Sequence, residues 1–395
     1  MAFDLSAVRA QTPGVQHGTH LLACGSALMP QVVVEAITEH IQLEARIGGY
    51  EAAAQQSEML DGVYADVAQL LGANPQEIAL MENATAAWCQ VFYGLKLKAG
   101  DRVLTCQAEY AANYVAYLHR AERDGILIEV IPNDESGAID LVALEAMLAV
   151  PAALISITWV PTNGGLVNPA AGVGQLARKY GVPYLLDACQ AVGQMPVDVA
   201  VLGCDYLTAT GRKFLRGPRG IGFLYVREEM IFKTEPAVID HFAAPWVAAN
   251  RYELRPDARR FENWENAYAL RAGLGAAVRY ALDIGIDTIH VRAWALAEQL
   301  RDGLRQMADI TLYDAGTTQC AIVSFAMVNA EPSAVVAYLG ERGIVIGTSA
   351  RNSTLLDADS RKLPTMLRAA PHYYNSEDEI ADLLACLKDC RQAAS

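Results

Sequence analysis

The chain has 395 residues and a formal charge of −14, from 31 Lys and Arg against 45 Asp and Glu. Hydrophobic residues make up 53% and charged residues 19%, which is typical of a well-packed globular protein and excludes a disordered one. We expect neither a nucleic-acid nor a membrane partner, because basic residues are not clustered and no stretch approaches the roughly 20 apolar residues that span a bilayer.

The N-terminal residues, MAFDLSAVRAQTPG, lack the basic and long apolar regions of a signal peptide, so we expect a cytoplasmic protein. The eight cysteines are scattered over the chain, at positions 24, 89, 106, 189, 204, 320, 386 and 390. Disulfide scaffolds are denser than this, so we predict reduced thiols. Cys386 and Cys390 have the spacing of one helix face, but two further ligands are missing nearby. We therefore predict no metal site.

From about residue 60 to residue 230, short apolar runs alternate with segments of helical period. The apolar runs lie at 77–82, 102–106, 126–132, 153–160, 182–188, 204–210 and 220–226, and the helical segments at 83–95, 110–123, 140–148 and 170–180. Such strand–helix repetition predicts an α/β fold with a mostly parallel seven-stranded sheet that helices cover on both faces.

The C-terminal part of the chain has a different pattern. Residues 266–307 predict long helices, followed by strands near 319–327 and 343–347 and a helix from about 376, where Ser376 and Glu379 have capping-box spacing. We predict a large α/β domain over residues 15–265. A smaller α+β domain over 266–395 would include residues 1–14, packed beside it.

Ligands bind at the carboxyl ends of the strands in open α/β sheets, so the residues after each predicted strand are of interest. Asp187 ends the apolar run VPYLLDA, and Lys213 follows a strand in TATGRKFLRGPRGIG. Alone, Asp187 could be a helix cap or part of a salt bridge, and Lys213 a surface residue. Together they are the two groups that a pyridoxal phosphate site needs, an amine for the Schiff base and a carboxylate for the pyridine nitrogen.

The motifs DACQAVG and TGRKFLRGPRGIGFLYV, with 26 residues from Asp187 to Lys213, resemble those of the class V aminotransferases, which include the cysteine desulfurases. The resemblance runs from GSALMP (25–30) to PHYYNSEDEI (371–380). It implies fold type I of the pyridoxal 5′-phosphate (PLP) enzymes, with PLP as cofactor. In this family Lys213 would form the internal aldimine and shuttle the α-proton, and Asp187 would pair with the pyridine nitrogen. Gln190 would bond the ring's phenolic oxygen, and Tyr110 falls where desulfurases carry a histidine stacked on the ring.

The phosphate group needs hydrogen-bond donors. NATAAW follows a strand and opens a helix, whose free N–H groups suit an anion, so we predict that Ala84 and Thr85 bind the phosphate. The resemblance implies that Thr210 and Arg212 join them and that Thr162, in PTNGG, contacts the ring's oxygen region. It also implies that Arg368, in MLRAAPHYYN, holds the substrate's α-carboxylate, a role that suits a planar guanidinium.

The loop before Arg368 bears on the reaction. Cysteine desulfurases carry a mobile cysteine there, whereas residues 343–360 of this chain contain none. The signatures GGYEAA, TWVPTNGGLVNP, RFENWE and RAAPHYYNSEDEI resemble the branch that holds isopenicillin N epimerase-like proteins and the C–S lyases of ergothioneine biosynthesis. That resemblance implies β-elimination from a cysteine S-conjugate, or a related β-substituted amino acid, through a quinonoid carbanion. The residues that would select the side chain are Tyr50, Ser349, Arg351 and Ser353, although ordinary loop residues are an equal alternative.

Transamination or epimerisation on the same carbanion is the alternative. A cofactor-free binding protein is disfavoured, because a scaffold needs none of Lys213, Asp187 and Arg368. The resemblance also implies a homodimer with its active sites at the interface. Family members often place a Gly-Thr pair near the partner's phosphate, where this chain has Trp264 and Glu265.

Overall fold

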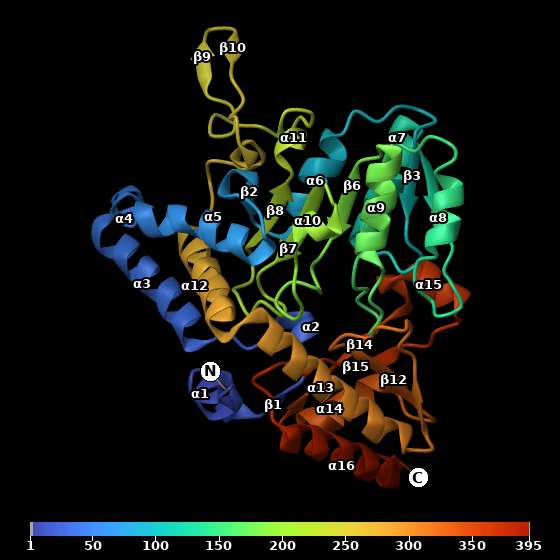
Figure 1. The fold of residues 1–395 in the computed structure, drawn as a ribbon. Helices are drawn as coiled ribbons and strands as arrows, with labels where there is room; N and C mark the ends of the chain where they lie inside the picture. The colour runs from blue at the N-terminus through green and yellow to red at the C-terminus, as the bar shows by residue number, and fades with distance from the viewer. Residues whose placement is uncertain (1–2, 395) are drawn as a thin grey trace.

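The computed structural model describes residues 3–394, with side chains up to residue 390. A seven-stranded sheet forms its centre (Figure 1). The strand order is β2 (Ile78–Met81), β8 (Gly222–Val226), β7 (Tyr206–Thr210), β6 (Tyr184–Asp187), β5 (Leu154–Thr158), β3 (Arg102–Thr105) and β4 (Leu127–Val130). Only β8 runs antiparallel to its neighbours, β2 and β7, among these pairings. The predicted α/β class and mostly parallel sheet are confirmed.

Strands β2, β5, β6, β7 and β8 are buried along their whole length because both faces of the sheet are covered there, whereas the edge strand β4 is partly exposed. On β6, Leu185 belongs to one buried cluster, whereas Tyr184 and Leu186 belong to the other, on the opposite face. The helices between the strands are α6 (Ala84–Gly94), α7 (Ala111–Asp124), α8 (Leu141–Met147), α9 (Ala170–Tyr180) and α10 (Val199–Leu202), and α11 (Glu228–Ile231) follows the last strand, β8. Trp88 and Phe92 of α6 pack on Tyr117 of α7, which holds these two helices together.

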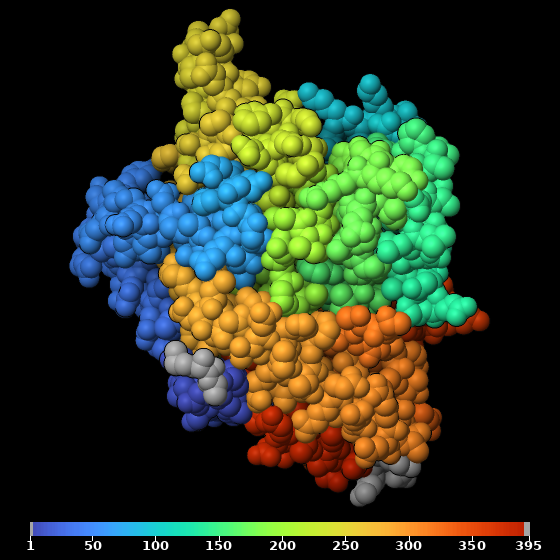
Figure 2. All heavy atoms as spheres, in the orientation of Figure 1, coloured from blue at the N-terminus to red at the C-terminus, as the bar shows by residue number. Residues whose placement is uncertain are grey.

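Further helices precede and follow the sheet. They are α1 (Leu5–Ala10), α2 (Ala23–Ser26), α3 (Gln31–Ile47), α4 (Gly49–Gln55), α5 (Ser57–Leu71) and α12 (Tyr268–Ile284). Helix α12 packs against α3 and α5. A hairpin of β9 (Trp246–Ala248) and β10 (Arg251–Tyr252) projects from the body of the molecule, and its projection is plain in both Figure 1 and Figure 2. No helix in residues 3–394 is long and apolar enough to cross a membrane.

The C-terminal residues form a second, antiparallel sheet below the first (Figure 1). Its order is β11 (Ile310–Leu312), β12 (Val323–Met327), β15 (Met366–Ala369) and β14 (Gly347–Ser349), with helices α13 (Ile286–Arg305), α14 (Pro332–Gly340), α15 (Leu355–Ser360) and α16 (Glu377–Ala394) around it. The N-terminal β1 (Thr19–His20) pairs with β13 (Ile344–Val345), and Arg9 of α1 forms an ion pair with Glu379 of α16. The division of the chain into domains at residues 14 and 265 stays a prediction.

Candidate active site

Three polar residues lie level on neighbouring strands, two of them at the carboxyl ends of β5 and β6. The strand register pairs Asp187 of β6 with Thr158 of β5 on one side and with Thr208 of β7 on the other. Asp187 is buried, with 6% of its surface exposed. One of its oxygens, Oδ1, accepts from the Cys189 backbone N–H at 2.9 Å, and Oδ2 accepts from the Asn113 amide at 3.0 Å. These two donors hold the carboxylate in one orientation at the edge of the sheet.

Lys213 lies three residues beyond the end of β7, in a compact turn. The Arg216 N–H donates to the Lys213 carbonyl, and the Gly217 N–H donates to the Gly211 carbonyl at 2.8 Å. Gly193 lets the turn after Asp187 touch this loop, because a Cβ on Gly193 would stand 2.3 Å from the Leu215 nitrogen. Its φ of 91° also lies in the region that favours glycine.

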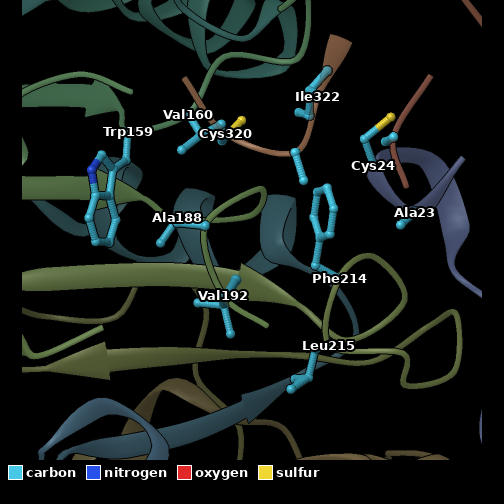
Figure 3. Packing of buried hydrophobic residues seen from close by; sticks show 14 of the residues in the cluster. Ala23, Cys24, Trp159, Val160, Ala188, Val192, Phe214, Leu215, Cys320 and Ile322 are labelled. Carbon is cyan, nitrogen blue, oxygen red and sulfur yellow. The ribbon is translucent and has the colours of Figure 1, made fainter. Parts of the chain in front are cut away.

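Apolar packing fixes the residues beside Lys213. Figure 3 shows Phe214 and Leu215 in one buried cluster with Val192 of the turn after β6, Cys24 of α2 and Ile322 before β12. The Lys213 amine lines a pocket with Tyr110, Thr158, Val160, Thr162, Asp187, Cys189 and Gln190. Burial lowers the pKa of Lys213, although Cys189 and Asp187 oppose this shift. A lowered pKa makes the neutral amine, the form that attacks a carbonyl, more available.

Tyr110 stands at the start of α7, and its ring centroid lies 6.0 Å from Lys213 Nζ. Gln190 and Thr162 lie on another side of the pocket. The Gln190 amide donates to the Cys24 carbonyl at 3.1 Å and to the Thr162 hydroxyl at 3.4 Å. Gln190 Oε1 is buried and has no hydrogen-bond partner among the described residues. An acceptor left open in this way suits a ligand hydroxyl.

Arg368 of β15 contacts Thr162, which lines the pocket. Its Nη1 donates to the Thr162 carbonyl at 2.7 Å and to the Thr162 hydroxyl at 2.6 Å. Its Nε is buried and finds no partner in the part of the chain that the structure describes. Because Nη1 is occupied, a carboxylate that accepts two parallel hydrogen bonds from Arg368 would use the Nε and Nη2 edge of the guanidinium.

The N-terminus of α6 lies against the ends of β7 and β8. Thr210, the last residue of β7, pairs with Gly222 of β8, and a Cβ on Gly222 would stand 3.2 Å from the Ala84 nitrogen. Asn83 caps the helix by accepting from the Ala86 N–H at 2.9 Å. Ala84 and Thr85 are the first two residues of α6, so their N–H groups are not used within the helix. The N–H groups of Ala84 and Thr85 therefore lie close to Thr210, at the carboxyl end of β7.

Arg212 lies beside the pocket. Its guanidinium donates to the Gly25 carbonyl of α2. Burial lowers the pKa of Arg212, and the charges of Arg219 and Arg368 act in the same direction, whereas Cys189 and Tyr110 oppose it. A guanidinium stays protonated in proteins, so Arg212 supplies a cation two residues after Thr210.

The structure does not bring the predicted substrate-selecting residues to this pocket. Tyr50, which is 76% exposed, lines a separate cavity of about 530 Å³ with Trp264 and Glu265. Arg351 is exposed and forms an ion pair with Asp359. Ser349 is buried in β14, and its hydroxyl has no partner among residues 3–394. Ser353 lies in a short 3₁₀ turn next to Arg351. The substrate roles of these residues stay predictions.

Three residues that the sequence did not single out belong to the site. Asn113 contacts Asp187, Glu109 contacts Asn113, and Cys189 lines the pocket. Glu109 and Asn113 are four residues apart in EYAAN, which places them on one side of the start of α7. This spacing is the one feature of the sequence that could have indicated that the two residues act together. All eight cysteines are free.

These side chains fit PLP. The pocket offers a lysine amine, a carboxylate fixed by two donors, an aromatic ring and an amide with an unused oxygen, with a helix N-terminus at the adjoining strand ends. The fold and the site together define a fold-type I PLP-dependent enzyme. The chain belongs to the aminotransferase class-V family, whose model matches residues 19–383.

Similar sequences and solved structures agree with this family assignment. A probable cysteine desulfurase from Synechocystis sp. is 29% identical, over 91% of this chain and 87% of its own length. The apo structure of a cysteine desulfurase from Thermococcus onnurineus superposes with a TM-score of 0.91, at 26% identity over 98% of both chains. The cystine C–S lyase C-DES, solved with its product cysteine persulfide, gives a TM-score of 0.87 at 26% identity, over 96% of this chain and 99% of its own. A lysine-to-alanine mutant of C-DES has glycine covalently linked to its PLP cofactor.

Proposed function

We propose that this PLP enzyme catalyses β-elimination, as a C–S lyase, from a cysteine S-conjugate or a related β-substituted amino acid. One observation carries the proposal. The chain has the amine, carboxylate and guanidinium that PLP chemistry on an amino acid requires, but no cysteine in residues 343–360, where desulfurases carry their sulfur acceptor. Without that thiol, the sulfur leaves with its substituent.

Each group has a part in this reaction. PLP, when bound, supplies an electron sink for the negative charge that develops at the substrate's α-carbon. Arg368 binds the α-carboxylate through its open edge, and Lys213 Nζ takes the α-proton. Asp187 would hold a proton at the pyridine nitrogen of bound PLP, and Tyr110 would lie over its ring. The Cβ–S bond then breaks, the thiolate takes up a proton, and the released aminoacrylate hydrolyses to pyruvate and ammonia.

The stretch 343–360 is also ordered by contacts. Asp357 of α15, 2% exposed, accepts from the Asn163 amide at 2.7 Å and from Arg361 at 3.2 Å. Asn163 follows Thr162 in the loop after β5, so these contacts join α15 to the loop whose Thr162 accepts from Arg368. An anchored segment without a thiol supports elimination, because a sulfur acceptor has to be both nucleophilic and mobile. The solved C–S lyase among the similar structures supports the same chemistry.

The test is pyruvate release by the purified holoenzyme from a panel of cysteine S-conjugates. Lys213→Ala is the inactive control, and Lys233→Ala, at an exposed lysine, is the matched control. We expect pyruvate from the wild-type protein and from Lys233→Ala only. Absence of pyruvate with the cofactor bound contradicts elimination. A keto acid that retains the side chain would then show transamination, and a racemised substrate would show epimerisation.

We further propose a homodimer. Helix α3 exposes Ile41 and Ile47, and the neighbouring cavity is lined by Tyr50 and Trp264, which are 76% and 42% exposed. Apolar residues gathered in this way suit a protein interface. A second copy on this surface would place Tyr50, Trp264 and Glu265 at the interface, where the family has its active sites.

Sedimentation equilibrium tests the dimer. The wild-type protein should sediment at twice the chain mass, and Ile41→Glu combined with Trp264→Glu should shift it toward the monomer. Val142→Glu, on the exposed face of α8, is the control and should remain dimeric. A wild-type monomer at micromolar concentration would contradict the proposal.

A further inference from the structure

A buried carboxylate lies behind Asp187. Glu109 is 3% exposed and follows β3. Its Oε1 accepts from the Tyr110 N–H at 2.8 Å, from the Asn113 amide at 2.9 Å and from the Thr158 hydroxyl. Its Oε2 accepts from the Thr105 hydroxyl at 2.9 Å and, at 3.4 Å, from the Tyr117 hydroxyl. Both oxygens thus face donors from two strands and from α7.

Asn113 joins this carboxylate to the site. Its Nδ2 donates to Glu109 Oε1 at 2.9 Å and to Asp187 Oδ2 at 3.0 Å, so one amide nitrogen bridges two carboxylates. The amide has two N–H groups, and each is used. Glu109 therefore fixes the orientation of the amide, and the amide fixes the Asp187 oxygen.

Within residues 3–390, no Lys, Arg or His side chain forms a salt bridge with the Glu109 carboxylate. Burial raises the pKa of Glu109, and the charge of Asp187 raises it further, whereas the hydrogen bonds from Thr158, Asn113 and the Tyr110 N–H lower it. A protonated ring nitrogen on bound PLP would offset the Asp187 charge and so remove that part of the rise. Within the described residues, the hydrogen bonds that reach the Glu109 oxygens come from donor groups, which is the arrangement that an ionised carboxylate accepts.

We propose that Glu109 is a positioning residue, whose negative charge acts through Asn113 on Asp187 and keeps the pyridine nitrogen of the bound cofactor protonated. Two carboxylates would then serve one ring nitrogen, one in contact and one behind it. The charge at the second carboxylate strengthens the electron sink without touching the cofactor or the substrate. This inference depends on PLP binding but not on whether the reaction is elimination, transamination or epimerisation.

The test uses ¹⁵N NMR of holoenzyme loaded with PLP labelled at the ring nitrogen, because protonation changes that nitrogen's chemical shift directly. Glu109→Gln removes the charge and keeps the shape, and Glu109→Met is a second neutral variant should the first fail to fold. We expect the ring nitrogen to lose its proton at a pH about one unit lower than in the wild type. In steady-state kinetics kcat should fall about tenfold, with KM unchanged because Arg368 is intact.

Asp205→Asn is the matched control. Asp205 is a carboxylate with 6% exposure that precedes β7, at the end of the strands opposite to Asp187. It accepts from the Tyr184 N–H and forms an ion pair with Arg227. This variant should lose stability and leave the ring titration unchanged. An unaltered ring titration in the neutral Glu109 variants would overturn the proposal, as would an equal shift in Asp205→Asn. Failure of the wild-type protein to bind PLP would instead refute the cofactor assignment.

Discussion

Arg368 Nη1 donates to both the carbonyl and the hydroxyl oxygen of Thr162, so a strand of the C-terminal sheet is tied to the loop after β5 at the site itself. Both of these bonds come from Nη1, whereas Nε has no partner among the described residues. The opposite edge, with the unpartnered Nε, keeps the planar fork that a carboxylate accepts.

We predict that Arg368→Lys raises KM for the amino-acid substrate about 10- to 100-fold, because an ammonium keeps the charge but cannot form two parallel bonds. Steady-state kinetics of pyruvate release, or spectroscopic titration with a substrate analogue, would measure it. Arg305→Lys, in an exposed ion-pair cluster on α13, is the control and should leave KM unchanged. A KM within twofold of the wild type in Arg368→Lys would show that the carboxylate binds elsewhere.

The ring of Tyr110 should matter more than its hydroxyl for holding the cofactor. Tyr110→Phe keeps the ring that faces Lys213, and we expect its dissociation constant for PLP to stay within about twofold of the wild type. Tyr110→Ala loses the stacked face and should bind PLP about tenfold more weakly. Fluorescence titration of the apoprotein with PLP measures both. Equal affinity in the alanine variant would remove Tyr110 from the cofactor's contacts.

The seven central strands were predicted from sequence within about two residues at each end, because strands buried on both faces form unbroken apolar runs. The capping box at Ser376 and Glu379 is confirmed, with both reciprocal hydrogen bonds present. Helix α3 was not predicted. Its exposed Val32 and Val34 flank the buried Val33, so both sides of the helix are apolar and its period is obscured.

Sequence predicted the site residues that stand in a short motif at the end of a predicted strand. Asp187 and Lys213 each end or follow a strand, so their place at the sheet edge follows from sequence. The antiparallel direction of β8 did not follow, because an apolar run does not reveal its direction. Glu109 was missed because its partner Thr158 lies 49 residues away, and such a contact exists only once the strands are in register.

A buried arginine joins the Lys213 loop to distant segments, and we predict a large stability loss on its removal. Arg216, 1% exposed, donates to the Leu28 carbonyl, the Tyr373 hydroxyl and the Thr12 hydroxyl at 2.7 to 2.8 Å. Its guanidinium also lies 4.6 Å from the Tyr374 ring centroid.

Arg216→Met leaves those three oxygens without their donor, so it should lower the free energy of unfolding by about 3 kcal/mol or more. Urea denaturation measures the change. Arg219→Met, at an exposed arginine of the same loop, should change stability by less than about 0.5 kcal/mol. A loss below about 1 kcal/mol in Arg216→Met would mean that the three segments hold together without it.

Acid should destabilise the protein through His372. This residue is fully buried, and its Nε2 donates to the Phe214 carbonyl at 2.7 Å. Burial, together with the charge of Arg216, lowers the pKa of His372 from 6.5 to about 3. The folded state therefore keeps the ring neutral at a pH where the unfolded chain has already bound a proton.

Between pH 6.5 and pH 3 the unfolded state binds more protons at this position, so stability falls as the pH falls through that window. From pH 7 to pH 5 the contribution is about 2 kcal/mol. Urea denaturation of the wild type and of His372→Gln separates the contribution of His372 from that of the other titrating groups. The glutamine amide can still donate to the Phe214 carbonyl. The glutamine variant should lose about 2 kcal/mol less over the same interval. Equal losses in the two proteins would show that His372 is protonated in the folded state, with its charge accommodated beside Arg216.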